Sequence, residues 1–219
     1  MDAAEITPEI LLNAYAMGIF PMAEARDAQD FHWVDPKQRG ILPLQGFHIS
    51  RSLSRQIRQR NYTIRTNSDF SEVVRACADR EETWINAPLF ALYLKLHEMG
   101  FAHSVEVWSE GALAGGVFGI ALGGAFFGES MFSHQTGGSK LALAHCIHRL
   151  RAGGFTLFDT QFLTPHLASL GGVEIARAAY RRLLQDALGR DATFFPEGYC
   201  PSPSVVASAG ASGATSGGS

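Results

Sequence analysis

The chain has 219 residues and 46% of them are hydrophobic, which is enough for a substantial core and excludes a wholly disordered protein. Its formal net charge of −3 excludes a bulk polycation, so nucleic acid would have to bind a local basic patch. The three widely spaced cysteines predict neither a disulfide framework nor a zinc site, and no signal peptide or membrane span is visible. We therefore expect a soluble, cytoplasmic protein.

The sequence pattern predicts that residues 1–66 form a small N-terminal lobe. Thr7-Pro8-Glu9 is typical of a helix start, because it offers a capping hydroxyl and a proline in the first turn, and Gly18 ends that helix. Prolines and glycines in 21–47 predict irregular chain with short strands. A helix from Ser50 to about Arg60 and a strand over 62–66 follow.

Residues 67–200 predict one larger α+β domain. Asp69 and Asn86 are suited to cap two helices, and the hydrophobic period then changes from helical to alternating. The expected elements after Asn86 are a helix up to Gly100, antiparallel strands over 104–108, 113–120 and 125–132, a helix over 139–151, a strand over 155–162 and a helix over 176–188. Residues 201–219 are uncharged and small and predict a disordered tail.

Asp159 and Gln161 lie two positions apart on an expected strand, which places both side chains on one face. An acid and an amide within an apolar strand need partners. They are either a satisfied structural pair or a carboxylate that orients an amide at a reacting centre. Glu129 lies in a strand of aromatic residues, where its carboxylate needs a cation. That cation is either an internal partner or a ligand, such as a peptide N terminus or a Lys or Arg side chain.

Aromatic and methionine side chains surround these polar residues in the sequence. Most of them are expected in the core, but a subset could line a pocket for an apolar amino-acid side chain. Met131 suits such a pocket because methionine adapts to more than one ligand shape. Trp84 either packs in the core or stacks on a nucleobase.

Arg51, Arg55 and Arg58 recur at the spacing that places them on one helix face. Such a run is either a solvated surface or a set of phosphate contacts. Because this is the most basic part of an otherwise acidic chain, it is the candidate site for nucleic-acid phosphates.

Several short motifs occur in a fixed order along nearly the whole chain apart from the tail. They are YAMGIFPM at 15–22, WVDPKQRGILPL at 33–44, FHISRSL at 47–53, TWI at 83–85, HSVEVW at 103–108, GESMFS at 128–133, DTQF at 159–162 and HLASLG at 166–171. Together they resemble the leucyl/phenylalanyl-tRNA–protein transferase family of bacteria.

The resemblance implies a mixed sheet flanked by helices in a GNAT-like fold (the acyl-CoA N-acyltransferase-like fold), behind a small N-terminal lobe. It implies transfer of leucine or phenylalanine, and sometimes methionine, from Leu-tRNA or Phe-tRNA to proteins that begin with Arg or Lys. This addition marks those proteins for the N-end rule degradation pathway. No cofactor or metal is implied, and a monomer is expected by analogy.

The matching motifs also imply roles for single residues. Asp159 and Gln161 resemble the catalytic pair, and Glu129 resembles the acidic residue of the active site. The expected substrate-binding residues are Trp84, which would stack on the terminal adenosine, and Ser130, Met131 and Phe158, of which the last two would line the amino-acid pocket. The chain departs from some relatives at Met22, where they have Trp, and at Thr164, where they have Asn.

Two other functions are compatible with parts of the pattern. An acyl-CoA N-acyltransferase would need a glycine-rich pyrophosphate loop between a strand and the next helix, and SHQTGGSK at 133–140 matches such a loop poorly. A non-enzymatic adaptor for basic N termini would need the acidic pocket but neither Gln161 nor tRNA.

Overall fold

The computed structural model describes residues 6–59 and 61–208, and it confirms the α+β class. Seven strands form its main sheet: β3 (Gln38–Ile41), β4 (Thr63–Thr66), β5 (Ala102–Ser109), β6 (Ala112–Leu122), β7 (Ala125–Ser133), β8 (Leu157–Gln161) and β9 (Val173–Ala176). Their order in the sheet is β4-β5-β6-β7-β8-β3-β9. Only β7 and β8 pair in parallel within this sheet, so it is mixed.

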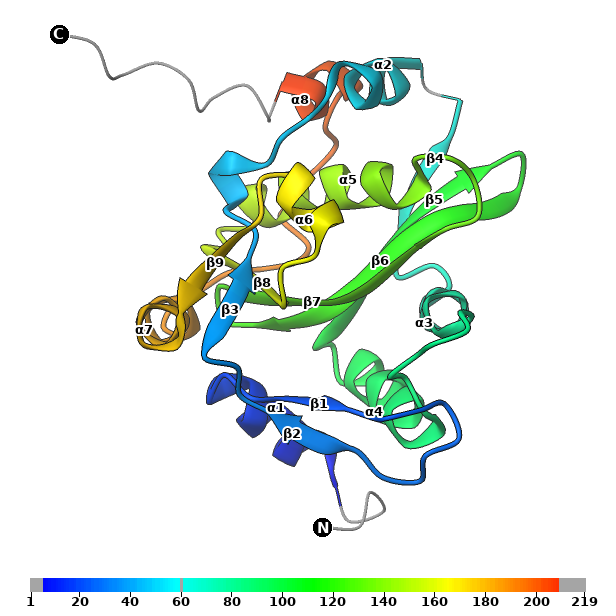
Figure 1. The fold of residues 1–219 in the computed structure, drawn as a ribbon. Helices are drawn as coiled ribbons and strands as arrows, with labels where there is room; N and C mark the ends of the chain where they lie inside the picture. Colours follow the sequence, from blue (N-terminus) through cyan, green and yellow to red (C-terminus); the bar gives the residue numbers. More distant parts are fainter. Residues whose placement is uncertain (1–5, 60, 209–219) are drawn as a thin grey trace, which may run out of the picture.

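Helices cover both faces of this sheet (Figure 1). They are α1 (Pro8–Ala16), α2 (Arg51–Gln59), α3 (Phe70–Ala78), α4 (Ala87–Glu98), α5 (Gly138–Ala152), α6 (Pro165–Ser169), α7 (Arg177–Leu188) and α8 (Pro203–Ser208). One hydrophobic cluster joins α1, α3, α4 and α7 to the sheet, and a second joins α2, α5 and α8 to its other face. The sheet is therefore the middle of three layers.

The helix starts follow the expected capping chemistry. The side chains of Thr7, Asp69 and Asn86 each accept a hydrogen bond from the backbone N–H three residues further on. These three predictions are confirmed, because a cap depends only on residues within one turn.

The N-terminal region contributes more to the main sheet than the sequence suggested. Strands β1 (Phe20–Met22) and β2 (His32–Val34) form a separate antiparallel pair. Strand β3, however, lies between β8 and β9, and β4 is the edge strand beside β5. A division of the chain at residue 66 therefore cuts across one continuous sheet.

The expected disordered tail needs a correction over its first residues. Residues 203–208 form α8, whose Val206 and Ala207 are buried with Leu53 and Ile57 of α2. Sequence composition did not predict this helix, because only two of its side chains are buried and they form no clear hydrophobic pattern. The rest of the expected tail, residues 209–219, and Arg60 at the end of the expected second helix lie outside the described residues.

The pairing of β7 with β8 covers only part of each strand. It runs from Ala125 opposite Leu157 to Phe127 opposite Asp159 and then stops, while β7 continues to Ser133. Beyond that point the two parallel strands no longer share hydrogen bonds. A gap between neighbouring strands in the middle of a sheet leaves room for a ligand.

The described residues contain no helix long and apolar enough to cross a membrane.

Candidate active site

A cavity of about 390 Å³ lies where β7 and β8 part. It receives side chains from both strands and from β6, α5, α6 and the segments around Met22 and Trp84. Its lining residues are Met22, Arg80, Trp84, Val117, Gly128, Glu129, Ser130, Met131, Leu143, Phe158, Thr160, Gln161, Phe162, Thr164 and Leu167. The cavity thus collects residues that lie far apart in the sequence.

Gln161 ends β8 in a left-handed backbone conformation, with φ at 60°. Residues other than glycine rarely adopt this conformation, which costs roughly 1–2 kcal/mol. The turn is held because the Gln161 backbone N–H donates to Asp159 Oδ1 at 2.8 Å. The side chain then reaches across the gap, where Nε2 donates to Glu129 Oε1 at 2.9 Å. Asp159 therefore orients Gln161 through its backbone and does not contact its side-chain amide.

Asp159 lies behind the cavity and is fully buried. Its charge is neutralised by Arg39 of β3, which donates from Nε to Oδ1 at 2.9 Å and from Nη2 to Oδ2 at 2.6 Å. Tyr180 of α7 donates to Oδ2 at 2.6 Å. The Arg39 guanidinium, itself 1% exposed, also donates to the Gly18 carbonyl and lies over the rings of Phe20 and Tyr180. Such a bidentate, hydrogen-bonded ion pair holds the end of β8 in a fixed position.

Glu129 has neutral partners, so the first of the two alternatives, a cation within the protein, is not found among the described residues. Among the described residues it forms no salt bridge; its Oε1 accepts from Tyr15 at 2.8 Å and from Gln161, and its Oε2 accepts from Tyr93 at 3.0 Å. Burial raises the pKa of Glu129 to about 7, although the two tyrosine hydrogen bonds act in the opposite direction. Burial also raises the pKa of Tyr15 and of Tyr93 well above the ordinary range, so both remain donors.

One wall of the cavity is apolar. It is formed by Val117, Met131, Leu143, Phe158 and Leu167. Gly128 allows this arrangement, because a β-carbon at that position would lie 2.5 Å from Cε1 of Phe158. Without a side chain at Gly128, the Phe158 ring can lie directly against β7.

Polar and aromatic groups occupy other parts of the lining. Trp84 is half-buried and its ring stands perpendicular to that of Tyr93, with centroids 6.3 Å apart. Arg80 is exposed and donates to Ser130 Oγ at 2.5 Å. Both positions that depart from some relatives, Met22 and Thr164, also line the cavity.

The cavity brings together most of the residues predicted from the sequence. Trp84, Glu129, Ser130, Met131, Phe158 and Gln161 all line it, and Asp159 lies directly behind Gln161. The sequence analysis assigned no role in the site to Arg39, Arg80, Thr160 or Tyr15. Arg39 had one signal, a charged residue inside the WVDPKQRGILPL motif.

The three arginines predicted to contact tRNA lie elsewhere. Arg51, Arg55 and Arg58 are all exposed on α2, whose opposite side buries Leu53 and Ile57. None of the three lines the cavity. They form a cationic surface that is separate from the cavity wall.

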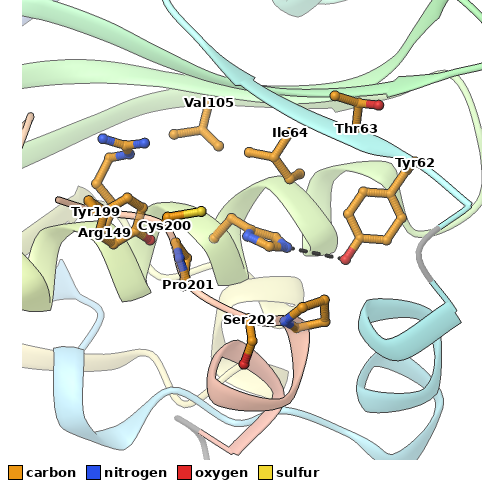
Figure 2. Close-up of a pocket in the computed structure, with 11 residues that line it drawn as sticks. Tyr62, Thr63, Ile64, Val105, Arg149, Tyr199, Cys200, Pro201 and Ser202 are labelled. Atoms are coloured by element: carbon orange, nitrogen blue, oxygen red, sulfur yellow. Dashed lines mark hydrogen bonds between the residues drawn. The ribbon is translucent and has the colours of Figure 1, made fainter.

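A larger cavity of about 700 Å³ lies between β4, α5 and the segment 199–203 (Figure 2). Three of its polar side chains already have partners. Tyr62 donates to the Ile57 carbonyl and shares a hydrogen bond with His145. Arg149 donates to the Phe194 carbonyl and lies over the Tyr199 ring. These contacts give Tyr62, His145 and Arg149 structural roles, so the size of the cavity alone does not make it the reactive site.

Comparisons with known proteins identify the family to which the chain belongs. Family models described as leucyl/phenylalanyl-tRNA protein transferase and as its N-terminal domain match residues 41–185 and 4–37. A protein of Cereibacter sphaeroides (strain ATCC 17025 / ATH 2.4.3) named leucyl/phenylalanyl-tRNA–protein transferase is 62% identical over 94% of this chain and 96% of its own length. One of the same name from Ruegeria sp. (strain TM1040) is 59% identical over 92% of this chain and 95% of its own.

Among solved structures, the crystal structure of FemX matches with a TM-score of 0.50 at 13% identity, over 79% of this chain and 70% of FemX. At that identity the match supports a shared fold alone. The sequence matches, by contrast, extend over nearly the whole chain at high identity. The chain therefore belongs to the leucyl/phenylalanyl-tRNA–protein transferase family and is an aminoacyltransferase that transfers an amino acid from tRNA to protein.

Proposed function

We propose that this enzyme moves leucine or phenylalanine, and also methionine, from the charged tRNA to the N-terminal Arg or Lys of acceptor proteins in the cytoplasm. The added residue marks those proteins for N-end rule degradation. The observation that carries the proposal is the cavity itself, in which an apolar wall meets a buried carboxylate and an oriented amide. An apolar aminoacyl group and a cationic acceptor need those two environments side by side.

The apolar wall supports the choice of donor amino acid. Met131, Phe158 and Leu143 offer no polar partner to a side chain, so leucine and phenylalanine gain from burial there and a charged side chain would lose its hydration. The flexible thioether of Met131 accommodates both a branched and a planar side chain. Trp84 is placed to stack on the terminal adenosine of the tRNA, since every base offers an aromatic face.

The polar end of the cavity supports the choice of acceptor. With a pKa of about 7, Glu129 is partly ionised at neutral pH, and the side chains that donate hydrogen bonds to it are all neutral. The negative charge of its ionised form therefore has no salt-bridge partner among the described residues. That charge attracts the cationic side chain of an N-terminal Arg or Lys. An acceptor whose first residue has a neutral or acidic side chain lacks this attraction. The interaction is strong because the surroundings of Glu129 exclude water.

The reaction is aminolysis of an ester. The acceptor's neutral α-amine attacks the ester carbonyl carbon, and a tetrahedral intermediate with a negatively charged oxygen forms. The bond to the ribose oxygen then breaks, the new amide remains on the acceptor, and the proton lost by the amine goes to the leaving ribose oxygen. An α-amine with a pKa near 8 is already roughly one tenth neutral at pH 7, so no strong base is required.

Gln161 holds the amine for this attack. Its Nε2 donates to Glu129, and its carbonyl oxygen Oε1 accepts a hydrogen bond from the amine in the cavity that Gln161 lines. Asp159 is a positioning residue, because it holds the Gln161 backbone and lies behind the cavity. Correct placement of the two reacting atoms supplies much of the rate acceleration.

The exposed face of α2 serves the rest of the tRNA. Arg51, Arg55 and Arg58 are free of described carboxylate partners, so they are available to phosphates. Phosphate contacts give affinity without base specificity. Binding of tRNA through this helix is therefore expected to weaken steeply with salt.

Family membership decides against the two alternatives considered from the sequence. A non-enzymatic adaptor and an acyl-CoA transferase would both leave the charged tRNA without a role.

The test is transfer of labelled leucine from Leu-tRNA, and of labelled phenylalanine from Phe-tRNA, to a peptide that begins with Arg. A peptide that begins with Ala but is otherwise identical serves as the control. Label on the Arg peptide alone is the expected result. Equal labelling of both peptides would contradict the acceptor rule, and no labelling by folded protein would contradict the proposed function.

A further inference from the structure

Thr160 stands out because its hydroxyl has no partner. Of the buried side-chain nitrogen and oxygen atoms in the part of the chain that the structure describes, Thr160 Oγ1 alone makes no hydrogen bond. The residue is 8% exposed and lines the smaller cavity. A buried hydroxyl without a partner destabilises the folded state, so its presence here calls for an explanation.

Thr160 lies where the lining of the cavity changes from apolar to polar. It lies two residues after Phe158 on β8, so the two side chains share one face of the strand, and it directly precedes Gln161. Phe158 belongs to the apolar wall and Gln161 to the polar end. The Thr160 hydroxyl therefore lies at the boundary between the two.

We propose that Thr160 is a catalytic residue that donates a hydrogen bond to the ester carbonyl oxygen of the aminoacyl group. This inference rests on the proposed function and assigns a residue to its reacting carbonyl. When the side chain of the aminoacyl group lies on the apolar wall, its ester carbonyl lies between that wall and the acceptor's α-amine. A hydroxyl at the boundary meets that oxygen, while Gln161 Oε1 and Glu129 serve the amine.

The chemistry of the step requires such a donor. As the amine attacks, the carbonyl oxygen gains negative charge, and a hydrogen bond to it becomes stronger in the transition state. A donor that is buried and already positioned supplies this stabilisation without reorganising water. Glu129 cannot donate when it is ionised, and the amide hydrogen of Gln161 directed at Glu129 is already used.

The test uses Thr160→Val, which keeps the shape and removes the hydroxyl, and Thr160→Ser, which keeps the hydroxyl. Steady-state transfer of leucine to the Arg peptide is measured over Leu-tRNA concentration. We expect Thr160→Val to lower kcat about tenfold or more with KM within about twofold, and Thr160→Ser to stay within about threefold of wild type.

A thermal melt of each variant separates this role from a structural one. Thr160→Val is expected to melt at or above the wild-type temperature, because it removes an unpaired buried hydroxyl. If Thr160→Val does not fold, Thr160→Ala replaces it. Wild-type kcat in the hydroxyl-free variant, or a loss confined to KM, would overturn the assignment. A wild-type enzyme that transfers no label would instead overturn the proposed function.

Discussion

The two cavities beside α5 differ in how far their polar side chains are satisfied. In the larger one, Tyr62 is hydrogen-bonded to Ile57 and His145, and Arg149 is bound to Phe194 and Tyr199 of the C-terminal segment. In the smaller one, a carboxylate has only neutral donors and Thr160 has no partner among the described residues. Under the proposed function, incomplete pairing of polar side chains marks the reactive site better than cavity volume does.

The largest expected effect comes from the ion pair behind the smaller cavity. Arg39→Met leaves the buried Asp159 carboxylate without its cation, and we expect a loss of roughly 3–5 kcal/mol in the free energy of unfolding. Urea denaturation measures this loss. Arg149→Met at the larger cavity is the control, because that guanidinium has no described carboxylate partner. Equal losses of unfolding free energy in the two variants would contradict the proposed difference between the two cavities.

The next effect concerns pH and Glu129. Its pKa of about 7 in the folded protein exceeds the ordinary value of 4.5, so the folded state holds the proton more tightly than the unfolded state. The associated stability is complete below about 4.5 and is lost as pH rises through about 7. Glu129→Gln does not titrate, so the wild-type protein should lose stability relative to this variant over that window.

The comparison with Glu129→Gln also removes other titrations. Burial lowers the pKa of His103 and of His145 to about 4, so these groups change stability in the opposite direction over acid pH. Both histidines are present in wild type and variant, and their contributions cancel in the difference. Thermal melts from pH 4 to pH 8 provide the measurement, and a flat difference would contradict the raised pKa.

A smaller effect in energy is expected for Gln161. Gln161→Ala removes the acceptor for the amine, and we expect turnover to fall by a factor of about ten or more, which corresponds to at least about 1.4 kcal/mol in the barrier. Gln185→Ala on the exposed face of α7 is the matched control. Wild-type turnover in Gln161→Ala would remove Gln161 from the mechanism.

The smallest effect is expected at the larger cavity. Tyr62→Phe loses hydrogen bonds to Ile57 and His145, so stability should fall by about 1 kcal/mol. Transfer should be unchanged within error, because none of these atoms lines the smaller cavity. A several-fold fall in turnover at full folding would give the larger cavity a role in the reaction.

Local features of the fold were predictable from the sequence. Thr7, Asp69 and Asn86 cap helices through bonds to neighbours in the next turn, so their environment is contained in a few residues. The short helix α6 and the edge strand β9 were missed, since α6 buries none of its residues and the residues of β9 are mostly exposed. Hydrophobic periodicity gives no signal for such elements.

The candidate site was predictable only in part, for a related reason. Glu129 and Gln161 could be recognised as polar residues in apolar strands. Their partners could not, because Tyr15 is 114 residues from Glu129 and Arg39 is 120 residues from Asp159. Thr160 lies within the DTQF motif, but only the fold reveals that its hydroxyl is unpaired.

The position of β3 has a consequence for how the protein is made. This strand leaves the ribosome early, yet both of its neighbours, β8 and β9, belong to the last third of the described chain. Its backbone groups therefore wait for partners until most of the polypeptide has been synthesised. Such distant pairing slows folding, and it makes the Arg39–Asp159 anchor one of the last contacts to form. We therefore expect a chain whose translation stops before β9 to contain the sequence motifs of the family but to be inactive as a transferase.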